Sequence, residues 1–440
     1  MFKTFINAFK LKDVRNRLLF TLAMLVIIRI GCQLPIPGVN RDYFSQVFAS
    51  KTGDAFSFFD AFTGGSFTNM SIFALNITPY ITSSIIMQLL TIAIPKLEDM
   101  NKEEDGRKKI AAITRYVTVG LALFESTAMA IGFGNQGLLD QANYNVLNII
   151  TIIVALTAGS AFLMWVGERI TEHGVGNGIS IVLVINIISR IPVDMAALYK
   201  RFIEPASNIG EALIKGAIVV LVIVATVVLV VLLNGGIRKI PVQYAKKVQG
   251  NRIMGGSNTH IPLRVNTAGV IPIIFASSIM QFPVIFCQLL NIGQGTGTTA
   301  EILRGLQSSH WFEKEQPLYT LGLALYVVLV IFFAYFYTAI TFNPMIISDN
   351  MKKSGGFIPG IRPGKPTTEY LNSVLNYIIF MGAVGLILVA IIPIFFSGMF
   401  SVNVTFGGTS LIIIVSVVLE TIKQVETLML QRNYKGFLNS

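Results

Sequence analysis

The sequence predicts an all-α, polytopic membrane protein, and three observations support this fold class. Hydrophobic residues make up 53% of the 440 residues and charged residues only 13%, which is about half the charged share of a typical soluble domain. The mean hydropathy is +0.66. Ten apolar stretches approach or exceed the length needed to cross a bilayer. They lie at residues 18–36, 72–94, 112–133, 146–167, 178–191, 213–234, 267–291, 318–341, 372–396 and 407–430.

The chain starts with a basic amphipathic arm, residues 1–17, which we predict to lie at the membrane surface. The arm and the following Leu18–Ile30 also resemble a cleaved signal peptide. A retained first span is favoured over that alternative. Gly31-Cys32 resembles a lipoprotein cleavage site, but Arg29, two residues before it, and the further spans disfavour this interpretation.

No residue pattern indicates an enzyme or a bound cofactor. Cys32 and Cys287 both lie in apolar runs, so neither a disulfide framework nor a cysteine-based metal site is predicted. The three histidines fall in connections and lack metal-ligand spacing. Gly174–Gly178 follows no strand and precedes no lysine, so it predicts a helix start and not a nucleotide site.

The distribution of Lys and Arg predicts the orientation in the membrane. Of the 34 such residues, 25 fall on the side of the N-terminus and 8 on the other side. By the positive-inside rule, both termini are then cytoplasmic. Ten spans divide into two sets of five, and an odd-numbered set makes the second half enter from the opposite side, as in an inverted repeat. The halves would cover residues 18–191 and 213–430, with an external connection at 192–212 and a tail at 431–440.

Four of the predicted spans contain helix breakers. In the second, the short apolar Phe56–Phe62 ends at Gly64-Gly65, and Ile72–Ile94 then resumes with several polar residues. Backbone freed at such a break must meet protein or water, so the segment is expected to line an internal cavity. The fifth span, Ile179–Ile191, would cover only about 20 Å. Part of Glu168–Gly178 is therefore expected to lie in a cavity at membrane depth.

The seventh span contains Gly269 and Pro272, and the tenth begins with Gly407-Gly408. These four broken segments are the candidates to meet at one central site. The alternative is that their glycines only allow close helix packing.

Six stretches over the whole chain carry a family pattern: Ser71–Ile81, Gly167–Ser180, Val265–Pro272, Asn343-Pro344, Pro359–Gly364 and Phe406–Ser410. They resemble, in the same order, the SecY family, the channel subunits of bacterial protein translocases. Asn76 stands where the family usually has Gly, His173 where Arg is common, and Leu183 where Ile is frequent.

The resemblance implies ten helices around a central hourglass pore with a plug and a lateral gate. The plug would lie at about residues 55–67, with Phe56, Phe58, Phe59, Phe62, Gly64 and Gly65. The pore ring would consist of Ile77, Ile81, Ile179, Leu183, Ile274 and Ile413. Gln88 and Asn266 would face each other across the lateral gate. Cytoplasmic loops at about 235–264 and 343–370 would bind a motor or the ribosome through Arg238, Lys239, Tyr244, Lys246, Lys247, Arg362 and Lys365.

The resemblance also implies a function and a set of partners. Such a channel translocates unfolded secretory polypeptides across the bacterial plasma membrane and releases hydrophobic helices laterally into the lipid bilayer. Its partners would be the small membrane subunits SecE and SecG, the motor ATPase SecA, the ribosome, and substrates with signal sequences. A secondary transporter is the main alternative, but it needs ionisable groups at membrane depth, and only Arg29 and Glu125 lie well inside predicted spans. A purely structural scaffold is a third interpretation.

Overall fold

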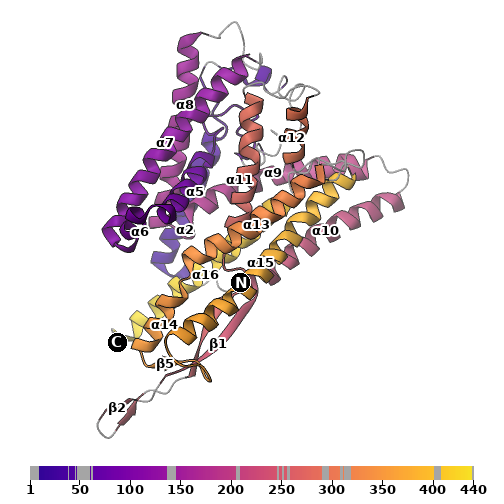
Figure 1. Cartoon of the computed structure of the whole chain (residues 1–440). Helices are drawn as coiled ribbons and strands as arrows, with labels where there is room; N and C mark the ends of the chain where they lie inside the picture. The colour runs from indigo at the N-terminus through magenta and orange to yellow at the C-terminus, as the bar shows by residue number, and fades with distance from the viewer. Residues whose placement is uncertain are drawn as a thin grey trace.

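Ten long helices lie where the ten spans were predicted. The computed structural model describes residues 9–37, 39–44, 46, 60, 63–135, 145–204, 209–244, 247–249, 252–254, 258–289, 297–307, 311, 319–400 and 408–438. The ten helices are α2 (Lys12–Gly31), α5 (Thr78–Ala93), α7 (Glu104–Asn135), α8 (Val146–His173), α9 (Gly178–Leu198), α10 (Ile209–Gly235), α11 (Ile271–Leu289), α13 (Thr320–Thr341), α15 (Lys365–Phe400) and α16 (Gly408–Leu438) (Figure 1). The all-α class is confirmed.

By length and composition alone, six of the described helices can cross a membrane. A seventh is added if α5 and the following α6 (Pro95–Lys102), bent by 103° at their junction, form one span. Helix α11 contributes a shorter apolar stretch, Ile271–Val284. Over their described residues, the other long helices, α2, α5, α11 and α16, do not meet the length and hydropathy criteria for a membrane span by themselves.

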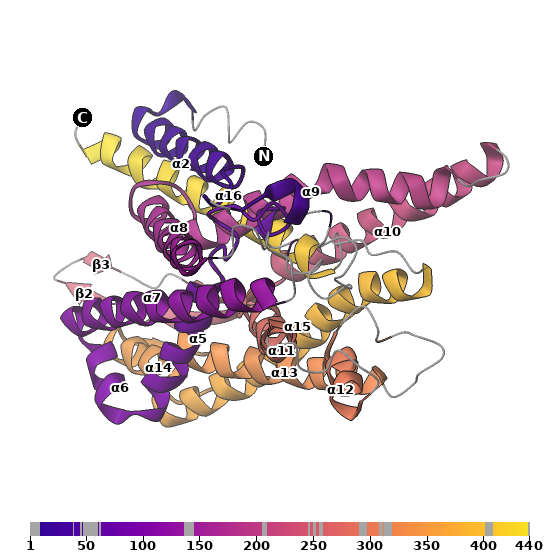
Figure 2. The same cartoon turned by 90° about the horizontal axis from the view of Figure 1, so that it is seen from above.

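The helices pack as two equivalent sets of five. In the first set, α2 contacts α8 and α9, and the successive helices α5, α7, α8 and α9 each contact the next. In the second set, α10 contacts α15 and α16, and α11, α13, α15 and α16 likewise contact one another in succession. All five neighbour pairs recur, as expected for an internal repeat. The sets meet where α7 contacts α11 and where α16 contacts α2 and α9 (Figure 2).

The fifth span is longer than the sequence predicted. Helix α9 has 21 residues, about 31 Å at 1.5 Å per residue, and it continues into a π-helical turn at Tyr199–Ile203. Pro192 lies inside the helix. A proline removes one backbone N–H and can kink a helix without ending it. Residues 192–198 are thus helical and not connection. Part of Glu168–Gly178 was expected at membrane depth because the fifth span looked too short. Since α9 is long enough and residues 168–173 belong to α8, that reason no longer holds.

The second span resumes later than predicted. Residues 72–77 form turns, and α5 begins only at Thr78. Asn76 has a φ of +53°, outside the helical region, and Pro79 is at the start of the helix, where its missing N–H costs nothing. The turns replace the first six residues of the predicted helix.

The two basic connections form one sheet and not two separate lobes. Strand β1 (Ile237–Tyr244) pairs antiparallel with β4 (Asn258–Arg264) on one side and with β5 (Gly356–Phe357) on the other. Two short strands, β2 (Lys247–Gln249) and β3 (Arg252–Met254), extend the hairpin. The sheet packs on α14 (Pro344–Lys353) and the start of α15 through a small apolar cluster. A further helix, α12 (Thr298–Leu306), contacts α11 and α13.

The two ends of the described chain lie on the same side of the bundle. Val14 in the first turn of α2 shares an apolar cluster with Val425 in the second half of α16 and with Val175 of the α8–α9 connection. The β1 sheet, α14 and the end of α16 lie at the same end of the molecule in Figure 1. This arrangement agrees with an even number of crossings.

Candidate functional site

The six predicted pore-ring residues contribute to one apolar cluster between the two halves. Ile77, Leu183 and Ile413 are buried members, with 0%, 5% and 1% exposed surface. Ile81, Ile179 and Ile274 are half-buried and pack against it. The cluster is larger than a ring, since it also contains side chains of α2, α8, α13 and α15. Aliphatic side chains offer no hydrogen bonds, so this region excludes water.

The predicted plug lies only partly within the described residues. Phe56, Phe58, Phe59 and Phe62 are outside them. Gly64 and Gly65 are described and have φ values of +67° and +83°, a region that favours glycine. At Gly64 a Cβ atom would also come within 2.8 Å of the Asn186 carbonyl oxygen. The turn therefore lies directly against α9.

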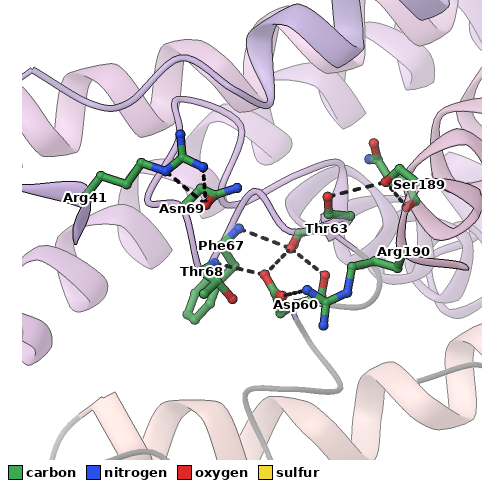
Figure 3. Close-up of polar contacts among 10 residues, drawn as sticks. Arg41, Asp60, Thr63, Phe67, Thr68, Asn69, Ser189 and Arg190 are labelled. Atoms are coloured by element: carbon green, nitrogen blue, oxygen red, sulfur yellow. Dashed lines mark hydrogen bonds and ion pairs between the residues drawn. The ribbon is translucent and has the colours of Figure 1, made fainter. Parts of the chain in front are cut away.

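A partly buried ion pair joins this turn to α9, with the Arg190 side chain 22% exposed (Figure 3). Arg190 Nη1 lies 2.6 Å from Asp60 Oδ2, and the Asp60 side chain is 2% exposed. The other carboxylate oxygen, Oδ1, accepts a hydrogen bond from the Thr68 backbone N–H at 2.9 Å. Ser189 Oγ contacts the Gly64 carbonyl oxygen at 3.4 Å. The turn is thus connected to α9 by a charged contact and a hydroxyl contact.

A second polar contact lies next to the first. Asn186 Nδ2 donates to Asn76 Oδ1 at 3.0 Å, and the Cys32 thiol donates to Asn186 Oδ1 at 3.8 Å. All three side chains are 1% exposed. We call Cys32, Asn76 and Asn186 the N-terminal triad. The φ of +53° at Asn76 fits its departure from the family pattern, because Asn is one of the few residues besides Gly that adopt a positive φ readily.

The two predicted gate amides have different partners in this structure. Asn266 Nδ2 donates to Asn234 Oδ1 at 2.8 Å, and Asn234 Nδ2 donates to Ser416 Oγ at 2.6 Å. We call Asn234, Asn266 and Ser416 the C-terminal triad. Gln88 donates to Ser84 of its own helix at 3.3 Å, while its Oε1 is buried and lacks a partner in the part of the chain that the structure describes.

The basic residues predicted to bind a partner lie on and beside the β1 sheet. Arg238 and Lys239 are exposed on β1, and Arg362 and Lys365 are exposed before and at the start of α15. Tyr244 is half-buried, and its ring lies against Gly356 of β5. Lys247 begins β2, whereas Lys246 is outside the described residues.

The Arg362 tip is held by side-chain hydrogen bonds. Thr367 Oγ1 donates to the Arg362 carbonyl oxygen, and Ser348 Oγ donates to that of Gly364, both at 2.9 Å. Gly360 and Gly364 have φ values of +83° and +102°, as tight turns require. A guanidinium group is therefore presented on a fixed backbone.

The remaining polar residues singled out in the sequence have few contacts. His173 is exposed, 3.7 Å from Glu172. Arg29 lies near Cys32, and its Nη1 is buried. Within the described ranges neither Arg29 nor Glu125 has an ion-pair partner, and no group of His, Cys, Asp and Glu could hold a metal ion.

The sequence interpretation did not find the residues of the ion pair or three of the six triad residues, Asn186, Asn234 and Ser416. Asp60 is a lone charge in the apolar Phe56–Phe62 run, and Asn186 and Ser416 are polar residues inside apolar spans. Polar groups at such positions need partners. That rule could have identified them as candidates, but it could not have paired them.

Comparison with known proteins gives the class and then the family. The fold is that of protein-conducting channels. A solved "structure of a protein conducting channel" aligns with a TM-score of 0.66 at 18% identity, covering 94% of this chain and 92% of the other. A SecY structure that describes its plug domain as stabilising the closed state gives the same values. Sec61 in the canine ribosome–channel complex gives a TM-score of 0.63 at 17% identity, with the same coverage.

Relatives found by sequence have a higher identity to this chain than these solved structures. A family model described as SecY matches residues 71–422. The chain is 42% identical over 448 residues to the protein translocase subunit SecY of Halalkalibacterium halodurans, and 42% identical over 454 residues to that of Streptomyces galbus. In both cases the whole length of each chain is covered. The chain belongs to the SecY family, and family and fold together make it a protein-conducting channel subunit of a translocase.

Proposed function

We propose that the chain passes unfolded secretory polypeptides across the bacterial plasma membrane and releases hydrophobic helices sideways into lipid. The observation that supports this most is the convergence of aliphatic side chains from both halves in one cluster. Branched aliphatic side chains make a constriction that dewets and blocks ions. Because they form no directional bonds, they can yield to a passing chain of any sequence. Residues 55–67 are proposed as the plug of this constriction.

Lateral release takes place at a gate between the second and seventh spans, α5 and α11, next to the contact of α7 with α11 where the halves meet. Gln88 of α5 and Asn266, just before α11, are the polar residues proposed for the two sides of this gate. A hydrogen bond between amides in lipid contributes about 0.6 kcal/mol on average. Each apolar residue of a signal sequence gains roughly 0.3–0.6 kcal/mol on entering lipid. A dozen such residues outweigh a few amide contacts, so an apolar segment opens the gate and a polar one does not.

The energy comes from partners. The exposed Arg238, Lys239, Arg362 and Lys365 suit phosphate-rich RNA or an acidic protein groove. We propose that they bind the ribosome and the motor SecA, and that SecE and SecG complete the membrane complex. The similar canine Sec61 is described in a ribosome–channel complex. Both termini are cytoplasmic in this proposal, on the side with the excess of Lys and Arg.

Crosslinking tests the proposed path. A variant with Cys32 and Cys287 replaced by Ala receives a single cysteine at Ile77 or Ile274, and a secretory chain is stalled during export. We expect thiol-specific crosslinks from both positions to the stalled chain. Val220 of α10, which is 60% exposed on the outer surface, is the matched control. Crosslinking no stronger than at Val220 would contradict a path through the cluster.

A further inference from the structure

The turn at residues 63–70, beside α9, is stabilised by several contacts of its own besides the Asp60–Arg190 ion pair. The Gly65 N–H donates to the Asp60 carbonyl oxygen at 3.1 Å, and the Phe67 N–H donates to Thr63 Oγ1 at 3.3 Å. Phe67 and Met70 are buried in an apolar cluster with α7 and α8. Backbone, hydroxyl and apolar contacts therefore hold the turn by themselves. The Asp60–Arg190 pair adds a charged contact across to a different element.

The positions of the α9 residues connect this contact to the pore cluster. Leu183 is a buried member of that cluster, and Arg190 follows it after seven residues, which is about two helical turns. Asn186, three residues after Leu183, is on the same side. One face of α9 thus presents in succession a pore residue, the partner of Asn76 and the partner of Asp60. A polypeptide that displaces Leu183 acts on the helix that holds the turn.

The stability of the ion pair depends on whether water reaches the two charges. In a dry interior, a buried charge pair is tolerated only while the charges remain together, because each alone is costly. Arg190 Nε is buried and has no partner within the described residues, so the guanidinium is incompletely satisfied. Water entering an open pore would hydrate both groups and remove the cost of separating them.

We propose that the Asp60–Arg190 ion pair is a latch that fastens the plug turn to α9 and sets how readily the channel leaves its closed state. The latch rests on the proposed function, because it assumes that residues 55–67 close a conducting pore. The charges are paired in the closed channel, with the Asp60 carboxylate shielded from water, and separated and hydrated in the open one.

Charge-neutralising variants of the full-length chain, purified with its membrane partners and placed in lipid vesicles, test the latch. Arg190→Gln leaves the buried Asp60 carboxylate without its counterion, and Asp60→Asn leaves the half-buried Arg190 guanidinium without its counterion. We expect each to raise the resting ion conductance about tenfold or more, and to admit signal sequences of lower hydrophobicity. The double variant Asp60→Asn/Arg190→Gln keeps polar partners at both positions and leaves no charge. It should return most of the way to the wild-type conductance.

Glu211→Gln and Lys215→Gln are the matched controls, since this pair is close in distance at 2.7 Å but lies exposed on α10. They should conduct as the wild type does. A purely structural ion pair would lower the unfolding temperature of the single variants and leave the resting conductance per channel unchanged, and that result would overturn the latch. Additive effects in the double variant would also overturn it. A wild-type complex that passes no secretory chain would overturn the proposed function itself, whereas a working wild type with unaffected variants overturns the latch alone.

Discussion

The two halves of the molecule make the same helix contacts but stabilise them with different residues. The N-terminal triad joins the ends of the first and second spans to α9, the fifth helix of its half, through Asn186. The C-terminal triad joins the corresponding three helices of its half, but Asn234 at the end of α10, the first helix, is at its centre. The same three helices are thus connected in each half through a different central residue.

The triads also differ in burial and charge. All members of the N-terminal triad are 1% exposed, and the Asp60–Arg190 ion pair lies beside them. In the C-terminal triad, Asn266 is 7% exposed and Asn234 is half-buried. Polar contacts are worth more, and their loss costs more, where water cannot replace the partner. We infer that the N-terminal half is the more firmly fixed of the two.

The strongest test of this difference is Asn186→Leu, which removes the centre of the N-terminal triad and keeps the branched shape and the number of side-chain heavy atoms. Two buried groups, the Asn76 amide and the Cys32 thiol, each lose their hydrogen bond to Asn186. We expect the free energy of unfolding in detergent to fall by about 3 kcal/mol. The control is Thr151→Ala, which removes an exposed hydroxyl bonded within its own helix and should change stability by less than about 0.5 kcal/mol. Equal values for the two variants would mean that the triad does not stabilise the half.

Substitutions at Asn76 separate its hydrogen bond from its backbone conformation. Asn76→Gly loses the acceptor for Asn186 but tolerates the φ of +53°, and should cost about 1 kcal/mol. Asn76→Ala loses the same hydrogen bond and adds the strain of a positive φ, for a total of about 2 kcal/mol. The unfolding free energies of both variants, measured under the same conditions, give the comparison. If Gly and Ala were equally destabilising, the backbone conformation would not explain why Asn stands here.

The sequence predicted the helices well because each depends on a local run of apolar residues. It also predicted the two sets of five from the number of spans. It could not pair Asp60 with Arg190, or Asn76 with Asn186, because these residues are 130 and 110 positions apart. No local rule connects residues at such separations. The same limit explains why Gln88 and Asn266 were interpreted as partners, although each bonds elsewhere in this structure.

Local patterns failed in two other places. The fifth span was expected to end at Ile191, yet α9 continues through Pro192 to Leu198. The basic connections were expected as separate lobes, but Gln243 of β1 pairs with Phe357 of β5 and joins them in one sheet. Strand pairing between distant segments depends on the helices that bring them together. The roles of the pore-ring, plug, gate and loop residues remain predictions.

The smallest expected effect is that of Asn234→Ala, which measures how much the C-terminal triad stabilises its half. The substitution leaves Asn266 and Ser416 without their shared partner, but Asn234 is only half-buried, so other groups can substitute for it. We expect a loss of about 0.6–1 kcal/mol, close to the average for hydrogen bonds between membrane helices. The same unfolding measurement as for Asn186→Leu checks it. A loss as large as that of Asn186→Leu would show that the two triads are energetically equivalent, and the firmer fixation of the N-terminal half would then have to come from the Asp60–Arg190 pair alone.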